Sequence, residues 1–156
     1  MVPKMPSSEP TRTTKGSLVT ELILTLFPLN GRVLSAGDTL SSSEGLSSSL
    51  WQVLGALKDA PRSVSQIGRV MGLTRQSVQR SVNIMKEDGL VELVKNPDHQ
   101  TSPLVRITNK GENAYRKVMR LQTEWSNGLG ERLRVDELKV AVRVLRTLLE
   151  ALENEE

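Results

Sequence analysis

The stretch Ser63–Thr108, SVSQIGRVMGLTRQSVQRSVNIMKEDGLVELVKNPDHQTSPLVRIT, carries the signals for two short helices, a tight turn and a two-stranded hairpin, in that order. Ser63 and Gln66 form the S-x-x-Q pattern of a capping box, and Gly72 can end the helix in a left-handed conformation. Thr74 then serves as the N-cap of a second helix. Because so short a turn with a glycine sets two helices at a steep angle, the stretch predicts a winged helix-turn-helix.

The second of these helices has two faces. Val78, Val82 and Met85 recur at helical spacing and predict an inward apolar stripe. The opposite arc carries side chains suited to reading base edges in the major groove, where Arg matches guanine and amides match adenine: Arg75, Gln76, Gln79, Arg80 and Asn83. The alternative interpretation is a solvated helix face, but the position directly after a tight glycine turn favours a recognition helix.

A hairpin is predicted after the recognition helix. Leu90–Lys95 and Leu104–Ile107 are rich in Leu and β-branched residues, and the polar, Pro-containing segment 96–103 separates them. Its tip places Lys95, His99 and Gln100 where they could follow a phosphate backbone or enter the adjacent minor groove.

Several motifs together resemble the MarR family of transcriptional regulators, from about Leu18 to the C-terminus. They are Gly45-Leu46-Ser47, Trp51-Gln52-Val53-Leu54, Leu73-Thr74 with Val78, Val82 and Met85, Asp88-Gly89-Leu90-Val91, Asn96-Pro97-Asp98-His99, and Val105-Arg106-Ile107-Thr108-Asn109-Lys110-Gly111. The resemblance implies an intertwined homodimer and a small-molecule site between the dimerisation helices and the winged domain. His99-Gln100-Thr101 stands where the family has Asp-x-Arg, which removes the arginine expected in the minor groove.

Composition limits the classes of protein that this chain can be. With 156 residues and 37% hydrophobic content, it can bury one core of ordinary size. The absence of cysteine excludes a thiolate redox sensor, a Cys-ligated zinc site and an iron–sulfur cluster. The single histidine, His99, has only Asp98 near it and is expected to be an exposed wing residue, so no metal or cofactor is predicted.

Charge is distributed unevenly along the chain. Residues 62–111 contain eight Lys or Arg and four acids, which gives +4, whereas residues 131–156 contain five Lys or Arg and seven acids, which gives −2. Positive charge therefore gathers on the half predicted to bind DNA, as phosphate neutralisation requires. No nucleophile–base pair or Gly-rich phosphate loop indicates an enzyme. With no uninterrupted run of about 18 apolar residues and no signal peptide, a cytoplasmic protein is expected.

Four segments are expected along the chain. Residues 1–16 form a disordered tail, and 17–45 form an N-terminal dimerisation helix, kinked or broken at Pro28, with an irregular connection over 33–45. Residues 46–111 form the winged domain, whose first helix buries Leu50, Val53, Leu54 and Leu57. Trp51 is expected to be a core residue, with lining a ligand pocket as the alternative. Residues 112–156 form C-terminal dimerisation helices, broken at 126–130.

The last helix is apolar around more than half of its circumference, which a monomer of this size cannot cover. The alternative is that this helix packs only within its own chain. We expect instead that a second copy covers apolar positions of the first and last helices: Leu18, Leu22, Leu26, Leu138, Val142, Leu145, Leu149 and Leu152.

The leading functional hypothesis is a mainly α protein with a small β wing, acting as a homodimeric, sequence-specific regulator of transcription, expected to repress. The alternatives are a winged-helix protein–protein module and a non-specific architectural DNA-binding protein. The predicted DNA-binding residues are Ser47, Ser63, Ser65, Thr74, Arg75, Gln76, Ser77, Gln79, Arg80, Asn83, Lys95, His99 and Gln100. Two-fold symmetry predicts an inverted-repeat operator with half-sites about 10 bp apart.

Overall fold

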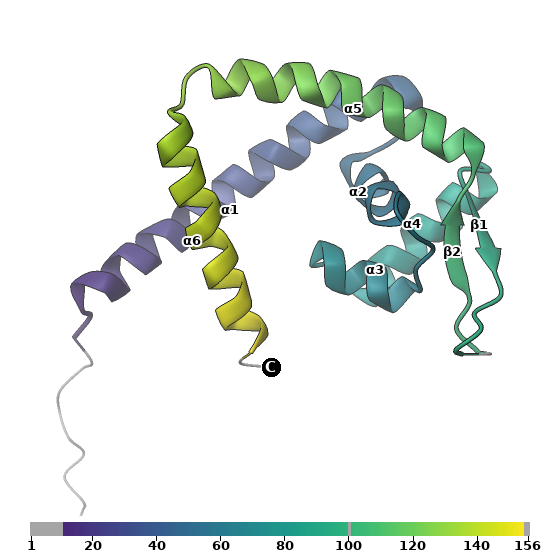
Figure 1. The fold of residues 1–156 in the computed structure, drawn as a ribbon, viewed down its shortest axis with the longest axis horizontal. Helices are drawn as coiled ribbons and strands as arrows, with labels where there is room; N and C mark the ends of the chain where they lie inside the picture. Colours follow the sequence, from purple (N-terminus) through teal and green to yellow (C-terminus); the bar gives the residue numbers. More distant parts are fainter. Residues whose placement is uncertain (1–10, 100, 155–156) are drawn as a thin grey trace, which may run out of the picture.

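The computed structural model describes residues 11–99 and 101–154 and confirms a mainly helical fold with a two-stranded wing (Figure 1). Helix α1 spans Thr14–Ser41 and continues into a 3-10 turn, η1, at Ser42–Glu44. The winged part comprises α2 Ser48–Leu57, α3 Val64–Met71, α4 Arg75–Glu87, β1 Val91–Val94 and β2 Leu104–Ile107. Helices α5 Asn109–Gly130 and α6 Val135–Glu153 complete the chain.

The winged part contains a hydrophobic core. All four α2 residues predicted to be buried lie in it. Its members come from the segment before α2, from α2 to α4, from the wing and from the first turns of α5: Leu46, Leu50, Val53, Leu54, Ala56, Leu57, Ile67, Val78, Val82, Met85, Leu90, Val91, Val105, Ala114 and Val118. Trp51 is half-buried and packs against this core, as the core interpretation predicts, and its indole N–H is buried and finds no hydrogen-bond partner among the described residues.

Capping residues fix the helix-turn-helix as predicted. Ser63 and Gln66 exchange both hydrogen bonds of the capping box, and Gly72 ends α3 with φ 62°. Thr74 accepts from the amide of Ser77 at the start of α4. Gly68 lies so close to the turn that a Cβ at this position would approach the Leu73 carbonyl oxygen to 2.7 Å. The helix angle therefore depends on a close backbone contact as well as on the caps.

The wing pairs β1 with β2 in antiparallel register, from Val91 opposite Ile107 to Val94 opposite Leu104. Arg62 forms an isolated antiparallel bridge to β2, because its amide and carbonyl exchange hydrogen bonds with Val105 at 3.1 and 2.8 Å. Its Nε also donates to the carbonyl of Ala56, 2.8 Å away, at the end of α2. Arg62 thus ties α2 to the wing, a contact that no local sequence signal predicts.

The motif Ile107–Gly111 joins the wing to α5. Thr108 caps α5 by accepting from the amide of Gly111, and its hydroxyl also donates to the carbonyl of Gly89 at 2.8 Å. Gly111 is buried, and a Cβ there would collide with the Leu90 carbonyl oxygen. Glycine is required here because α5 begins directly against the strand-entry backbone.

Helix α1 differs from the prediction in three respects. It begins at Thr14, so that residues 14–16 are helical, while the predicted disorder of 1–10 lies outside the described residues. Of the kink or break predicted at Pro28, the break does not occur, because Pro28 and Leu24 are exposed and water can bind the Leu24 carbonyl that loses its donor. The expected irregular connection over 33–45 is helical to Ser41, because this end of α1 packs on α2, where Gly37 lies against Ser48 and Asp38 accepts from the Ser48 amide at 2.7 Å.

The C-terminal helices also differ from the prediction. Helix α5 continues through Ser126–Gly130, and the reversal falls at residues 131–134 instead. The Ser126 hydroxyl donates to the Thr123 carbonyl within the helix, and a glycine inside a helix costs only about 1 kcal/mol. Helix α6 begins at Val135 as predicted, and among the described residues none of its side chains is buried.

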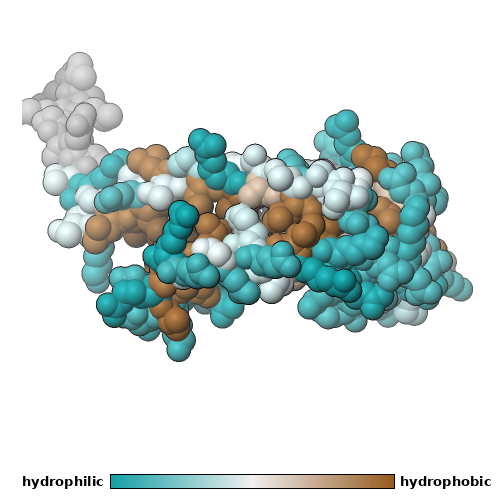
Figure 2. Space-filling model, turned by 90° about the horizontal axis from the view of Figure 1, so that it is seen from above, coloured by the Kyte–Doolittle hydropathy of each residue, from teal (hydrophilic) through white to brown (hydrophobic). Residues whose placement is uncertain are grey.

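Helix α1 is more membrane-like than expected from its longest apolar run. Within Thr14–Glu44, an 18-residue window reaches a mean hydropathy of 1.3, which is long and apolar enough to cross a membrane by length and composition alone. Figure 2 shows exposed hydrophobic side chains over the end of the molecule that carries α1 and α6, whereas the winged end is mainly hydrophilic. The expectation concerned runs of about 18 apolar residues, whereas this window includes polar residues, and a core helix of a soluble protein or a signal sequence passes the same test.

Candidate nucleic-acid interface

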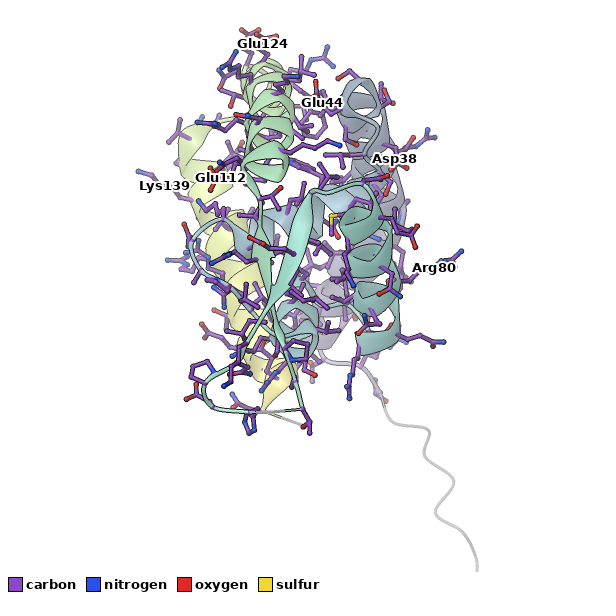
Figure 3. All side chains as sticks on the ribbon, turned by 90° about the vertical axis from the view of Figure 1, so that its right-hand side faces the viewer. Asp38, Glu44, Arg80, Glu112, Glu124 and Lys139 are labelled. Atoms are coloured by element: carbon purple, nitrogen blue, oxygen red, sulfur yellow. The ribbon has the colours of Figure 1, made fainter. Side chains whose placement is uncertain are left out.

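The exposed face of α4 carries the candidate recognition residues. Val78, Val82 and Met85 are at most 1% exposed and hold one side of α4 on the core. The five polar residues of the opposite arc are all exposed, as predicted: Arg75, Gln76, Gln79, Arg80 and Asn83. In Figure 3, Arg80 points away from the molecule, so its guanidinium is accessible to a large partner.

Two of these side chains form a unit on α4. The Gln79 amide nitrogen donates to Oδ1 of Asn83 at 3.0 Å, one helical turn further on. This bond orients both amides and leaves the Gln79 oxygen and the Asn83 nitrogen available. One remaining acceptor and one remaining donor match the pattern that adenine presents in the major groove.

The hydroxyls predicted at helix N-termini are mostly used for capping. Ser47, Ser63 and Thr74 each accept from a backbone amide three residues later, at 3.3, 3.3 and 3.2 Å. Ser63 is also buried, so its side chain is poorly placed to reach a partner. Ser65 is half-buried and Ser77 is exposed, and both lie in the first turns of their helices.

The wing tip is organised by one buried amide. The Asn96 side chain donates to the Ser102 carbonyl at 2.8 Å and accepts from the Asp98 amide at 3.0 Å, which closes an Asx turn. Lys95 and His99 are exposed on either side of it, as predicted, and Gln100 lies outside the described residues. Arg106, on the second strand, is paired with Glu92 at 2.9 Å.

Arg69 is a candidate that the sequence interpretation missed. It lies on the exposed face of α3 and lines a polar groove between α3 and the wing, together with Ser65, Asn96 and His99. A guanidinium beside the wing tip increases the positive charge on this side of the molecule. The i, i+4 spacing of Ser65 and Arg69 could have indicated a shared exposed face.

The carboxyl whose pKa is lowered lies outside this surface. Arg134 hydrogen-bonds Asp136 and holds the pKa of that carboxyl below its ordinary value, but this pair lies at the start of α6, away from α4. Among the described residues, no group of three His, Asp or Glu side chains could hold a metal ion. The chemistry that the α4 face offers is hydrogen bonding and cationic charge, which suits an anionic polymer with readable edges.

Comparisons with known proteins agree with this geometry. The model of the MarR family matches residues 44–100, which include the helix-turn-helix and the first strand of the wing. The uncharacterized protein Rv2011c of Mycobacterium tuberculosis is 32% identical over 137 residues, which cover 88% of this chain and 96% of that protein. The transcriptional activatory protein BadR of Rhodopseudomonas palustris is 28% identical over 105 residues, which cover 65% of this chain and 60% of BadR.

The same fold occurs in the solved structure of Staphylococcus aureus MarR in complex with salicylate and kanamycin. The TM-score is 0.76 at 14% identity, and the match covers 90% of this chain and 95% of that one. The exposed face of α4, the capped helix-turn-helix and these relatives lead to one conclusion. The chain belongs to the MarR family and is a DNA-binding transcriptional regulator.

Proposed function

We propose that the protein binds an inverted-repeat operator as a homodimer, with one α4 helix in each of two successive major grooves. The observation that carries the proposal is the face of α4 on which Arg75, Gln76, Gln79, Arg80 and Asn83 are exposed together. Half-sites would lie about 10 bp apart, centre to centre.

Individual contacts follow from side-chain chemistry. Arg75 and Arg80 would bind guanine O6 and N7 or phosphates, and the Gln79–Asn83 unit would bind adenine. Gln76 lies one turn before Gln79 and Arg80 on the same exposed face. The hydroxyls of Ser65 and Ser77 make no hydrogen bond within the described part of the chain, so they are better placed to contact DNA phosphates than those of Ser47, Ser63 and Thr74. These three would act by holding the helix N-termini.

The wing would add backbone contacts rather than base contacts. Lys95 and His99 are exposed near the tip, and Gln100 is proposed from the sequence alone. Arg69 brings a guanidinium to the groove beside this tip. The groove also contains the carboxylate of Asp98, so a phosphate bound between α3 and the wing would depend on the Arg69 guanidinium.

A second copy would cover the apolar surfaces of α1 and α6. Leu18, Leu138, Val142, Leu145, Leu149 and Leu152 are all exposed in the single chain. Leu22 and Leu26 are half-buried and, with Val140 and Val144 of α6, line an apolar groove between the two helices. So large an exposed apolar surface is typical of an interface in a soluble protein.

The same argument bears on localisation. We propose that a second copy rather than lipid covers α1, and that the protein is cytoplasmic. Cell fractionation tests this: the protein should remain in the soluble fraction without detergent. Recovery in the membrane pellet, released only by detergent, would instead indicate that the Thr14–Glu44 segment inserts.

Repression controlled by a small molecule is the form of regulation that we propose. The end of α6 and the helix-turn-helix border a groove lined by Arg69, Arg75, Val70, Leu149 and Leu152, among others. Two guanidinium groups outnumber the single carboxylate of this groove, Glu153, and suit a small organic anion, provided that the second copy leaves part of Leu149 and Leu152 open. Salicylate, present in the Staphylococcus aureus structure, is one such molecule. Because Arg75 also belongs to the α4 face, a bound anion would compete with DNA.

The experiment that tests the proposed function is selection of bound fragments from a random duplex library at about 0.15 M salt, paired with the mass of the protein in solution. An enriched inverted repeat bound by a dimer supports the proposal. A dimer without an enriched sequence would favour the architectural alternative. A protein that binds no DNA but captures an acidic protein surface would favour the interaction module, whose binding should depend less steeply on salt.

A further inference from the structure

Helix α2 receives part of its N-terminal cap from a different helix. The Ser47 hydroxyl accepts from the amide of Leu50, while the amide of Ser48 donates to Oδ1 of Asp38, on α1, at 2.7 Å. Free amides at a helix N-terminus attract a carboxylate, so this bond draws the end of α1 against α2. Figure 3 labels Asp38 together with Glu44, which lies in the next segment of the chain.

The two helices touch almost backbone to backbone at this crossing. The Ser48 hydroxyl donates to the carbonyl of Leu34, and a Cβ at the buried Gly37 would lie 2.6 Å from that hydroxyl oxygen. Ser41 is fully buried, with its hydroxyl 2.6 Å from the Gly37 carbonyl. Small residues and paired polar groups thus replace the apolar side chains that usually separate two packed helices.

An ion pair also holds the segment that follows α1. Lys117 of α5 pairs with Glu44 of η1 at 3.0 Å, and the Glu44 side chain is only 19% exposed. The end of α1 is therefore held to α2 on one side and to α5 on the other. Because α2 shares its core with α3 and α4, the direction of α1 is fixed relative to the recognition helix.

We propose that Asp38 is a positioning residue that sets the half-site spacing of the operator. The proposal rests on the proposed dimer, in which α1 takes part in subunit association while α2 to α4 carry the DNA-reading face. The Asp38–Ser48 bond at the crossing then determines how far apart the two α4 helices lie.

The length of α1 is suitable for such a role. From Thr14 to Gly37, α1 is about 36 Å long at about 1.5 Å per residue. A tilt of about 5° at the crossing would move the far end of such a lever by about 3 Å, which is close to the rise of one base pair, about 3.4 Å. Small changes in cap geometry would therefore shift the preferred spacing by about one base pair.

The test measures affinity for duplexes that carry the selected half-sites at a series of spacings around the preferred one. For the wild-type protein we expect each base pair away from the optimum to cost about tenfold in affinity, because protein or DNA must deform. Asp38→Ala should flatten this profile to about threefold or less per base pair, with the affinity for one isolated half-site and the dimer mass unchanged. Asp38→Asn, which keeps an acceptor oxygen, should restore most of the preference.

The matched control is Asp59→Ala, which removes the same charge from an exposed position whose described partner is Lys58, 3.8 Å away. It should keep the wild-type profile. Gly37→Ala is a second variant with a different expected result, because the added methyl would push the helices apart and move the optimum rather than flatten it. This variant keeps the test informative if Asp38→Ala does not fold.

The outcomes separate the two proposals. An Asp38→Ala dimer that keeps the wild-type spacing profile, or a Gly37→Ala dimer with an unmoved optimum, overturns the role of Asp38 and leaves the proposed function intact. A wild-type protein that is monomeric, or that shows no spacing preference, overturns the proposed function and the role of Asp38 together.

Discussion

The Gln79 side-chain nitrogen lies 3.0 Å from Oδ1 of Asn83 on the exposed face of α4, so these two amides act as one oriented group. If the group reads adenine, Gln79→Ala and Asn83→Ala should each cost about 1–3 kcal/mol of specific binding. Because either substitution also frees its partner, the double variant should cost less than the sum, with a coupling of about 0.5–3 kcal/mol. Titration of the four proteins against one selected operator measures this coupling, and strictly additive costs would show that the amides act independently.

The two arginines of α4 predict a different pattern. Arg75→Ala or Arg80→Ala should weaken specific binding by about 1–3 kcal/mol if the guanidinium is bidentate to guanine, and should relax the preference at that base. A phosphate contact would instead weaken binding to all sequences and lower the salt slope by about one. Operator variants titrated at several salt concentrations distinguish these cases.

Arg120→Ala is the control for this pair, since it removes the same charge from an exposed position on α5. It should leave operator affinity within about twofold of wild type, because charges separated by more than a Debye length, about 8 Å, are largely screened. If Arg75→Ala and Arg80→Ala also changed neither affinity nor base preference, the assignment of α4 as the reading helix would be wrong.

The parts of the fold that were predictable are those that local chemistry determines. The capping box at Ser63, the left-handed Gly72 and the N-cap at Thr74 act within a few residues, and the stripe that includes Val78 follows from helical periodicity. Each signal and its structural consequence lie in the same short segment. The helix-turn-helix and the exposed residues of α4 were therefore predicted correctly.

Other features of the fold depend on contacts between residues that are distant in the sequence. The Ser-rich end of α1 has weak helix propensity, yet it is helical where Gly37 packs on Ser48 and Asp38 caps α2. The Arg62 bridge to Val105 also joins residues far apart in the sequence. The base contacts of α4 and the dimer face remain predictions, since both depend on a partner molecule.

Two glycines of α5 provide a matched test of the wing–helix junction. Gly111→Ala should lower the free energy of unfolding by at least about 2 kcal/mol, because its Cβ would collide with the Leu90 carbonyl. Gly128→Ala, with nothing within 4 Å of its Cβ, should raise it by about 0.4–1 kcal/mol. Urea unfolding at one fixed protein concentration measures both. Equal effects of the two substitutions on the free energy of unfolding would show that the backbone around Gly111 can accommodate a Cβ.

The exposed apolar face of α6 gives the most direct test of association. Leu149 is 58% exposed in the single chain, and Leu149→Asp would place a charge in the proposed interface, where an unpaired buried charge costs several kcal/mol. The variant should elute as a monomer at micromolar concentration, and its operator affinity should fall steeply, because one half-site alone supplies only part of the binding energy. Light scattering after size exclusion reports the mass.

Thr147→Asp adds the same charge to α6 beside Arg143, Arg146 and Glu150, half a helical turn away from Leu138 although the same surface groove reaches Leu138 and Val142, and it should remain a dimer. A dimeric Leu149→Asp with full operator affinity would place the subunit contact elsewhere. A monomeric Thr147→Asp would indicate that the polar side of α6 also takes part, because only a buried position is expected to reject a single added carboxylate.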